Sequence, residues 1–170
     1  MADLKTIPPY VEGHALLKGK NVVVTAAAGT GIGFATAKKC IEEGAHVHIS
    51  DIHPERTAKA AAELSKLSDR AVTFSICNVT VQDDVDGLMA DAAQKMGDIN
   101  VVINNAGLGG TADLVDMTDE QWMSVLDVTL NGCFRINRAA IQYIKEHDGG
   151  AIVNNASVPG WRSPKGQAQE

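Results

Sequence analysis

A glycine-rich loop near the start of the sequence contains residue types that could bind a phosphate. It runs from Thr25 to Gly33, includes Gly29 and Gly31, and follows a short run of valines. Glycines let the backbone approach a pyrophosphate closely, and the N-terminus of a following helix supplies free N–H groups and a partial positive charge. Many turns contain glycine for conformational reasons alone, so the loop by itself leaves a phosphate cradle and an ordinary turn both open.

A carboxylate, Asp51, ends the next apolar run, and it follows the loop by about 20 residues, the spacing typical of a ribose-binding acid. There it could accept hydrogen bonds from both hydroxyls of an adenosine ribose. The alternative is an acid that is favoured by the dipole of a helix beginning at Pro54. The loop and Asp51 together favour a dinucleotide site.

Short apolar runs that alternate with helix-like segments must position these residues. The expected strands are 21–25, 45–50, 71–76, 99–103 and 151–153, and the expected helices are 33–43, 54–67, 81–96 and 119–147. Thr80 with Asp83 resembles a capping box, and so does Thr118 with Gln121. Strands that alternate with helices through short connections predict an α/β fold with a doubly wound parallel sheet of about five strands and helices on both faces.

Length and composition predict one ordinary globular domain. The 170 residues are 45% hydrophobic and 21% charged, and we expect a surface arm over residues 1–18 and one domain over residues 19–170. The net charge of -6 argues against a nucleic-acid partner, because such proteins concentrate Lys and Arg. No apolar run reaches the length of a membrane span, and the acidic, proline-containing start does not resemble a secretory signal, so a cytoplasmic protein is expected.

The thiols and imidazoles do not form a metal-binding pattern. Cys40, Cys77 and Cys133 are widely spaced, and we expect reduced, buried thiols. His46 and His48 share a face of the second expected strand, but no third ligand accompanies them. The sequence therefore predicts no metal site.

Five segments resemble the short-chain dehydrogenase/reductase family in their order and spacing. They are the loop ending in Gly31-Ile32-Gly33, the Asp51 position, Cys77-Asn78-Val79-Thr80, Asn104-Asn105-Ala106-Gly107 and Asn154-Asn155-Ala156-Ser157. The resemblance runs from Lys20 to Glu170. More loosely, the alanine-rich loop and the Gly-Trp-Arg segment after Ser157 resemble the branch that acts on CoA thioesters in actinobacterial steroid breakdown.

The resemblance implies a Rossmann-type domain of a nicotinamide-dependent oxidoreductase, which moves a hydride between its cofactor and a secondary alcohol or ketone. The looser resemblance implies a CoA thioester as the substrate. It implies cofactor contacts at Thr25, Gly29, Gly31, Ile32, Gly33, Asp51, Asn78, Val79, Asn105, Ala106 and Gly107. NAD is expected over NADP, because Asp51 would repel a 2′-phosphate. Asn78 stands where the family usually has Asp, and its side-chain oxygen could still accept a hydrogen bond from the adenine amine.

The resemblance also implies that Ser157 holds the substrate oxygen while charge develops there, although a serine satisfied by backbone at a strand end is the structural alternative. Thr129 takes the place of the family's supporting Asn, and Ala26 takes the place of the first loop glycine, in a loop one residue longer. The family's catalytic Tyr falls at Glu170, whose carboxylate is ionised near neutral pH and cannot donate the required proton.

We therefore expect the 170 residues to be incomplete for catalysis, without the family's last strands and helices. The alternative is a non-catalytic dinucleotide-binding fragment or pseudoenzyme that acts through interaction. The 119–147 segment is apolar over more than one face, so a homo-oligomer is also expected.

Overall fold

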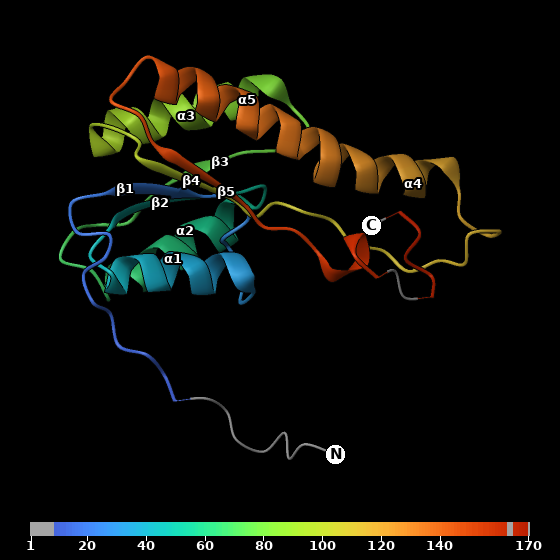
Figure 1. Ribbon diagram of the computed structural model, residues 1–170, viewed down its shortest axis with the longest axis horizontal. Coiled ribbons are helices and arrows are strands. Elements are labelled where there is room, and N and C mark those ends of the chain that lie inside the picture. Colours follow the sequence, from blue (N-terminus) through green and yellow to red (C-terminus); the bar gives the residue numbers. More distant parts are fainter. Residues whose placement is uncertain (1–8, 163–164, 170) are drawn as a thin grey trace.

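The β-branched runs of the sequence pair into a five-stranded parallel sheet in the computed structural model, which describes residues 9–162 and 165–169 (Figure 1). The strands are β1 (Asn21–Val24), β2 (His46–Asp51), β3 (Thr73–Ile76), β4 (Val101–Asn104) and β5 (Ala151–Asn154). Their order is β3-β2-β1-β4-β5, so the strand order reverses between β1 and β4. Such a reversal is the point at which doubly wound sheets bind ligands. The predicted α/β, doubly wound parallel sheet is confirmed.

Helices cover both faces of this sheet. The helices α1 (Ile32–Glu42) and α2 (Pro54–Ser65) lie on one face, and α3 (Gln82–Met96) and α5 (Gly132–Lys145) lie on the other (Figure 1). Side chains alternate along β1, so that Val22 and Val24 belong to one core and Val23 belongs to the other. All three valines are fully buried, as expected for a central strand of a parallel sheet.

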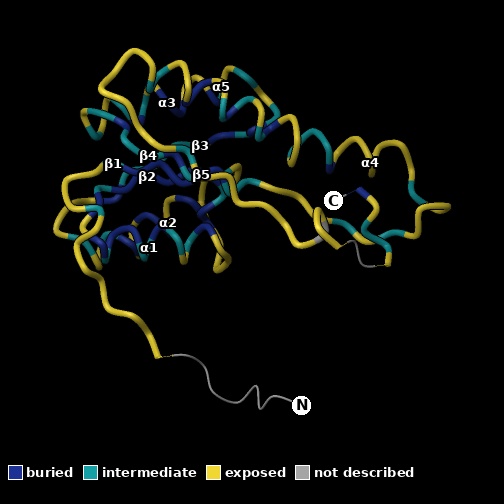
Figure 2. Tube along the Cα trace, viewed as in Figure 1, coloured by how far each residue is buried: buried dark blue, intermediate teal, exposed yellow. Residues whose placement is uncertain are grey.

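The interior strands of the sheet and its β5 edge differ in burial. Figure 2 shows β1 and β2 mostly buried and β5 largely exposed. On β5, Val153 is 51% exposed. Within the described residues, β5 pairs with β4 alone, through a register that sets Asn154 beside Asn104. The carboxyl end of β5 therefore reaches the same edge of the sheet as the other strand ends.

One of the two expected capping boxes is present. Thr118 caps α4 (Asp119–Leu126), because its hydroxyl accepts from the Gln121 N–H at 3.2 Å and its own N–H donates to Gln121 Oε1 at 2.9 Å. The expected box at Thr80 and Asp83 is wrong. The N-cap of α3 is Val81 without a side-chain bond, and the Thr80 hydroxyl donates instead to Asn78.

The expected 119–147 helix is interrupted by one π-helical turn. α4 continues into the turn η1 (Asp127–Asn131) and then into α5, and in Figure 1 α4 projects beyond the sheet. The Asp127 carboxylate accepts from Asn131 Nδ2 and from Arg135 Nη2, each at 3.0 Å, which stabilises the widened turn. Thr129 lies within η1, and π-turns of this kind often occur at functional sites.

The described part of the N-terminal arm docks on the C-terminal end of α1, while residues 1–8 of the expected arm lie outside the described residues. The Glu43 carboxylate accepts from the backbone N–H of His14 at 2.8 Å and of Leu16 at 3.1 Å. These bonds and the nearby Lys39 lower the pKa of Glu43. No helix in the described chain is long and apolar enough to cross a membrane.

Candidate functional site

Five loops meet where the parallel strands end at their carboxyl termini. These are the loops that follow β1, β2, β3, β4 and β5, and they carry the residues that the sequence analysis singled out. Two neighbouring cavities lie among them, with volumes of about 430 Å³ and about 250 Å³. Both cavities are lined by Ala106, Gly107 and Leu108, so the segment after β4 forms the boundary between them.

The glycine-rich loop packs tightly against the turn after β4. A Cβ atom on Gly33 would lie 2.4 Å from the Ala26 carbonyl oxygen and 2.6 Å from Asn105 Nδ2, so only glycine fits there. Gly31 is the N-cap of α1 and supplies no side chain to the first free N–H groups of the helix. Ala26 adopts a positive φ of 51°, a conformation that glycine adopts more readily, in line with the glycine that the resemblance implies at this position. The loop thus presents a helix N-terminus, as an anion site requires.

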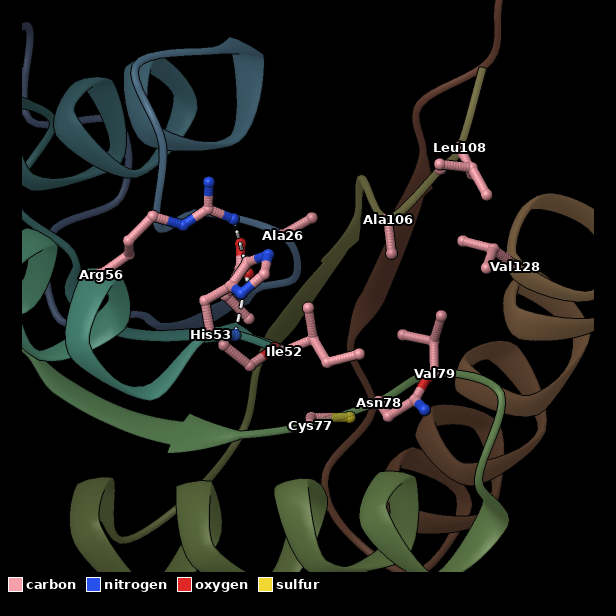
Figure 3. A pocket seen from close by; sticks show the side chains of 13 residues that line it. Ala26, Ile52, His53, Arg56, Cys77, Asn78, Val79, Ala106, Leu108 and Val128 are labelled. Carbon is pink, nitrogen blue, oxygen red and sulfur yellow. Dashed lines mark hydrogen bonds and ion pairs between the residues drawn. The ribbon is translucent and has the colours of Figure 1, made fainter. Parts of the chain in front are cut away.

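Asp51 lines the larger cavity, together with His53 and Arg56, which Figure 3 labels. Asp51 Oδ2 accepts from the Ala28 N–H at 3.2 Å, and Oδ1 accepts from the His53 N–H at 3.3 Å. Arg56 Nη2 lies 3.8 Å from Oδ1. The carboxylate side chain is 11% exposed, so it is held in place beside the loop rather than extended into solvent.

Asn78 lines the same cavity from the end of β3, beside Cys77 and Val79 (Figure 3). Its Oδ1 accepts from the Thr80 N–H at 3.1 Å and from the Thr80 hydroxyl at 2.9 Å. Its backbone N–H donates to Asp84 Oδ2 at 2.9 Å. The oxygen that was expected to meet an adenine amine is therefore committed to Thr80, a turn interaction that spacing alone does not reveal.

Thr25 joins β1 to the turn after β4. Its buried hydroxyl accepts from the backbone N–H of Asn105 at 2.9 Å and of Ala106 at 3.0 Å. Asn105 Nδ2 in turn donates to the carbonyl oxygens of Thr25 and Ala26, each at 3.2 Å. This reciprocal set of bonds brings the expected cofactor positions after β1 and β4 together.

The smaller cavity brings Ser157 and Thr129 together, with Ile32 and Cys133 also on its wall. Ser157 is exposed at the start of the 3-10 turn η2 (Val158–Gly160). The Thr129 hydroxyl accepts from the Leu108 N–H at 3.1 Å and donates to the Leu108 carbonyl oxygen at 3.2 Å. Thr129 therefore positions the segment between the two cavities, and the only proton of its hydroxyl is already donated to Leu108.

A cluster of amides beside this cavity was not singled out from the sequence. Asn154 Oδ1 accepts from Asn137 Nδ2 at 2.9 Å and from Asn104 Nδ2 at 3.2 Å. Asn104 Oδ1 accepts from the Thr25 hydroxyl at 3.3 Å, so the bonds continue to β1. The signal for this cluster is the Asn-Asn-Ala segment that ends both β4 and β5.

The three cysteines differ in their surroundings. Cys40 and Cys77 are buried, and burial raises the pKa of their thiols to about 11 and about 12, so they stay protonated. Cys133 is only partly buried, unlike the expectation, because it faces the smaller cavity. Among the described residues, no group of three or more His, Cys, Asp or Glu side chains could hold a metal ion.

Two tyrosines are present in the sequence, and both lie away from Ser157. Tyr10 belongs to the arm and donates to Glu42, and the Tyr143 hydroxyl donates to Asp98 Oδ1 at 3.1 Å, just before β4 begins. Glu170, the position counted for the family's tyrosine, lies outside the described residues.

Comparison with known proteins agrees with this arrangement. The family profile described as short chain dehydrogenase matches residues 20–169. A Mycobacterium tuberculosis protein named (5R,7aS)-5-hydroxy-7a-methyl-1-oxo-2,3,5,6,7,7a-hexahydro-1H-indene-carboxyl-CoA reductase is 50% identical over 167 residues, which are 98% of this chain and 64% of that protein. A 3-oxoacyl-acyl-carrier-protein reductase of Chlamydia muridarum is 36% identical over 91% of this chain and 62% of its own length.

Solved structures show the same relationship. A short chain dehydrogenase from Mycobacterium smegmatis superposes with a TM-score of 0.94 at 48% identity, covering 98% of this chain and 70% of that one. NAD+-bound xylitol dehydrogenase superposes with a TM-score of 0.85 at 30% identity, covering 91% of this chain and 59% of that one. The chain thus spans less than two thirds of the length of the two curated relatives described above.

Proposed function

The chain belongs to the short-chain dehydrogenase family, and we propose that it supplies the NAD site and the substrate-oxygen site of an oxidoreductase acting on a secondary alcohol or ketone. Its family uses a nicotinamide cofactor, and several of its relatives are named as reductases or dehydrogenases. The observation that carries the proposal is the Asp51 carboxylate, which lines the larger cavity and accepts a hydrogen bond from the Ala28 N–H of the glycine-rich loop.

The residues present fit such a cofactor. The α1 N-terminus offers backbone N–H groups for a pyrophosphate, and Asp51 offers oxygens for the two ribose hydroxyls. Gly33 supports the same fit, because its missing side chain lets α1 approach the turn after β4. The larger cavity would hold the adenosine half, and the smaller cavity, with Ser157 on its wall, would hold the reacting half.

NAD is the proposed cofactor rather than NADP. A 2′-phosphate on the adenosine ribose would be placed against the Asp51 carboxylate, and like charges repel at such distances. Arg56 is a nearby cation, but its guanidinium already lies 3.8 Å from Asp51 Oδ1. Arg56 therefore offsets only part of the Asp51 charge.

Calorimetric titration with NAD and with NADP tests this proposal. We expect tighter binding of NAD, and Asp51→Ala should weaken NAD binding by about ten-fold, because two charge-assisted hydrogen bonds are lost. Asp69→Ala is the matched control, since Asp69 is exposed and lines a different cavity, with Lys18 and Arg70. Tighter binding of NADP, or equal losses in the two variants, would contradict the assignment of Asp51.

Ser157 is proposed to hold the substrate oxygen. The nicotinamide would supply or accept the hydride when bound. Ser157 would donate a hydrogen bond to the oxygen on which charge develops, and Thr129 would act indirectly by positioning Leu108. With a secondary alcohol or ketone as substrate, Ser157→Ala should lower kcat in a protein that carries the proton donor, while NAD affinity stays unchanged.

A second candidate function is dinucleotide binding without turnover. It is supported by the positions of Tyr10 and Tyr143, because neither can deliver a proton to an oxygen held by Ser157. An assay of the 170-residue chain with NADH and ketones, including CoA thioesters with a ring ketone, separates the two functions. Binding without turnover supports this second candidate for the chain itself, whereas robust turnover would identify another proton donor.

Self-association is part of the proposal. The continuous helical segment α4–η1–α5 buries one set of apolar residues and exposes another. The buried set is Val125, Ile136 and Ala140, whereas Phe134 and Ile141 are 59% and 48% exposed. A second copy of the chain could cover these exposed apolar side chains. Sedimentation should show a dimer or larger species at tens of micromolar, and Phe134→Asp should shift it toward the monomer.

A further inference from the structure

The Asn78 amide presents a hydrogen-bond donor, not an acceptor, for recognition of a base. An amide oxygen has two lone pairs, and both of those on Oδ1 are used by the N–H and hydroxyl of Thr80. No hydrogen bond among the described residues uses Asn78 Nδ2. Because Asn78 lines the larger cavity, its NH2 group is the part of the side chain that remains for a ligand.

The orientation of this amide is set by the turn that follows it. Rotating the amide by half a turn would place its NH2 group against the Thr80 N–H, and that backbone donor would lose its acceptor. A carboxylate at position 78 would differ, because one oxygen could serve Thr80 while the other accepted from a ligand. Asn78 therefore presents a hydrogen-bond donor to the cavity, where an aspartate would present an acceptor.

Adenine and a 6-oxopurine respond in opposite ways to a hydrogen-bond donor that faces C6. Adenine carries an amine donor at C6, and a 6-oxopurine carries an oxygen acceptor there. A donor on the protein is mismatched with the amine and matched with the oxygen. The backbone N–H of Val79, which no described hydrogen bond uses, has the opposite preference, since it suits the unprotonated N1 of adenine. Each base would then gain one contact and lose the other.

We propose that Asn78 makes the cavity bind a 6-oxopurine dinucleotide about as well as NAD. The inference rests on the proposed function, because it takes the larger cavity to be the adenosine site. It adds that the protein hardly discriminates between bases at C6, and that one side chain is responsible.

Calorimetry with NAD and with nicotinamide hypoxanthine dinucleotide tests the proposal. The two dissociation constants should agree within about three-fold, whereas Asn78→Asp should favour NAD by about ten-fold or more. With the aspartate, hypoxanthine has two mismatched contacts instead of one: acceptor against acceptor at C6, and the Val79 N–H against the N1–H. Gln82→Glu is the matched control, since it adds the same charge at the start of α3 outside the cavity lining. The ratio of the two constants should stay unchanged in this control.

The outcomes separate this proposal from the proposed function. If NAD binds but the hypoxanthine dinucleotide binds more than ten-fold more weakly, and Asn78→Asp does not alter that ratio, the role of Asn78 is overturned and the NAD site stands. If neither dinucleotide binds, both proposals fail.

A second variant covers the case in which Asn78→Asp does not fold, because its new carboxylate lies near Asp84. Thr80→Val removes one of the two donors to Asn78 Oδ1 and keeps the shape of the side chain. The freed lone pair could then accept from the adenine amine, so the ratio should shift toward NAD by about two- to three-fold. An unchanged ratio in Thr80→Val would overturn the proposal.

Discussion

The β1–β2–β3 half and the β4–β5 half of the sheet hold their functional residues in different ways. In the first half, Asp51 is 11% exposed and is fixed by backbone N–H groups of its own and the neighbouring loop. In the second half, Asn155 and Ser157 are exposed, and the bonds around Asn154 come from side-chain amides. Hydrogen bonds to the backbone are costly to break, because a buried peptide group left without a partner has no water molecule to replace it.

This difference between the halves corresponds to a division between cofactor binding in the β1–β2–β3 half and the chemical step in the β4–β5 half. A preorganised first half can hold a dinucleotide without rearrangement, so that most of the interaction energy appears as affinity. An exposed second half can change its residues with little effect on the fold, and the Thr at position 129 where the family has Asn is such a change. Substitutions should therefore affect stability mainly in the first half.

The largest effect is expected where the two halves touch. Gly33→Ala places a Cβ atom 2.4 Å from the Ala26 carbonyl oxygen and 2.6 Å from Asn105 Nδ2, and the Ala26 backbone cannot move aside as a flexible side chain could. We expect the free energy of unfolding to fall by about 4 kcal/mol, at the upper end of overpacking effects. Gly31→Ala is the matched control, because nothing lies within 4 Å of its Cβ position. Urea denaturation of both variants gives the comparison, and equal losses would contradict the tight contact at Gly33.

A second test compares two residues that both contact Asn105. Thr25→Val leaves the partly buried N–H groups of Asn105 and Ala106 without an acceptor and should lower the free energy of unfolding by about 3 kcal/mol. Thr25→Ser keeps the hydroxyl and should cost about 1 kcal/mol, the value of a buried methyl. Asn155→Ala removes an exposed bond to Asn105 Oδ1 and should cost about 0.5 kcal/mol. A loss for Asn155→Ala that matches Thr25→Val would remove the distinction between the halves.

The sequence was sufficient for the strands and for a doubly wound parallel sheet, since apolar runs and turn residues have short-range causes. The strands and the helix segments begin and end within two residues of their expected positions. The sequence was not sufficient to predict the π-turn at 127–131 or the hydrogen-bond partners of the Asn78 side-chain oxygen. A π-turn leaves the apolar spacing of a helix almost unchanged, and the Asn78 bond depends on how one turn folds back on itself. Both failures concern hydrogen bonds that residue types permit but do not require.

The third test uses pH and the buried imidazole of β2. His48 Nδ1 is 2.8 Å from the Thr73 hydroxyl and Nε2 is 2.8 Å from the Ser75 hydroxyl. Burial lowers the pKa of His48 to about 4, and the nearby carboxylate of Asp91 only partly opposes this. Ser75 also donates to Asp91, so the imidazole is held neutral within a satisfied network.

The lowered pKa of His48 determines whether the free energy of unfolding rises or falls with pH. The unfolded chain takes up the proton first, near pH 6.5, so stability is full above that value and is lost as the pH falls toward 4. Between pH 7 and pH 5 the contribution of His48 should fall by about 2 kcal/mol. Asp91 does not add to this window, because its pKa lies below its usual value of 3.8.

Urea denaturation at the two pH values checks the expectation. His48→Gln should have the flatter pH dependence, whereas His14→Gln, in the exposed arm, should behave as the unsubstituted protein. The same slope in all three proteins would contradict the role of His48. An effect confined to His48 would show that acid weakens the β1–β2–β3 half first.

The smallest effect is expected at the strained residue of the glycine-rich loop. Ala26 has a φ of 51°, and the left-handed region costs a non-glycine residue about 1–2 kcal/mol. Ala26→Gly removes this strain but gives the unfolded chain more freedom, which costs about 0.5–1 kcal/mol. The net expectation is a gain of about 0.5 kcal/mol in the free energy of unfolding.

Ala15→Gly is the matched control, because Ala15 has a φ of 59° in the exposed arm. The backbone contribution is then the same in both variants, and only Ala26 has a methyl group on the wall of the larger cavity. A loss at Ala26 with a gain at Ala15 would show that this methyl group packs against the β1–β2–β3 half, and that the alanine stabilises the loop despite its strain.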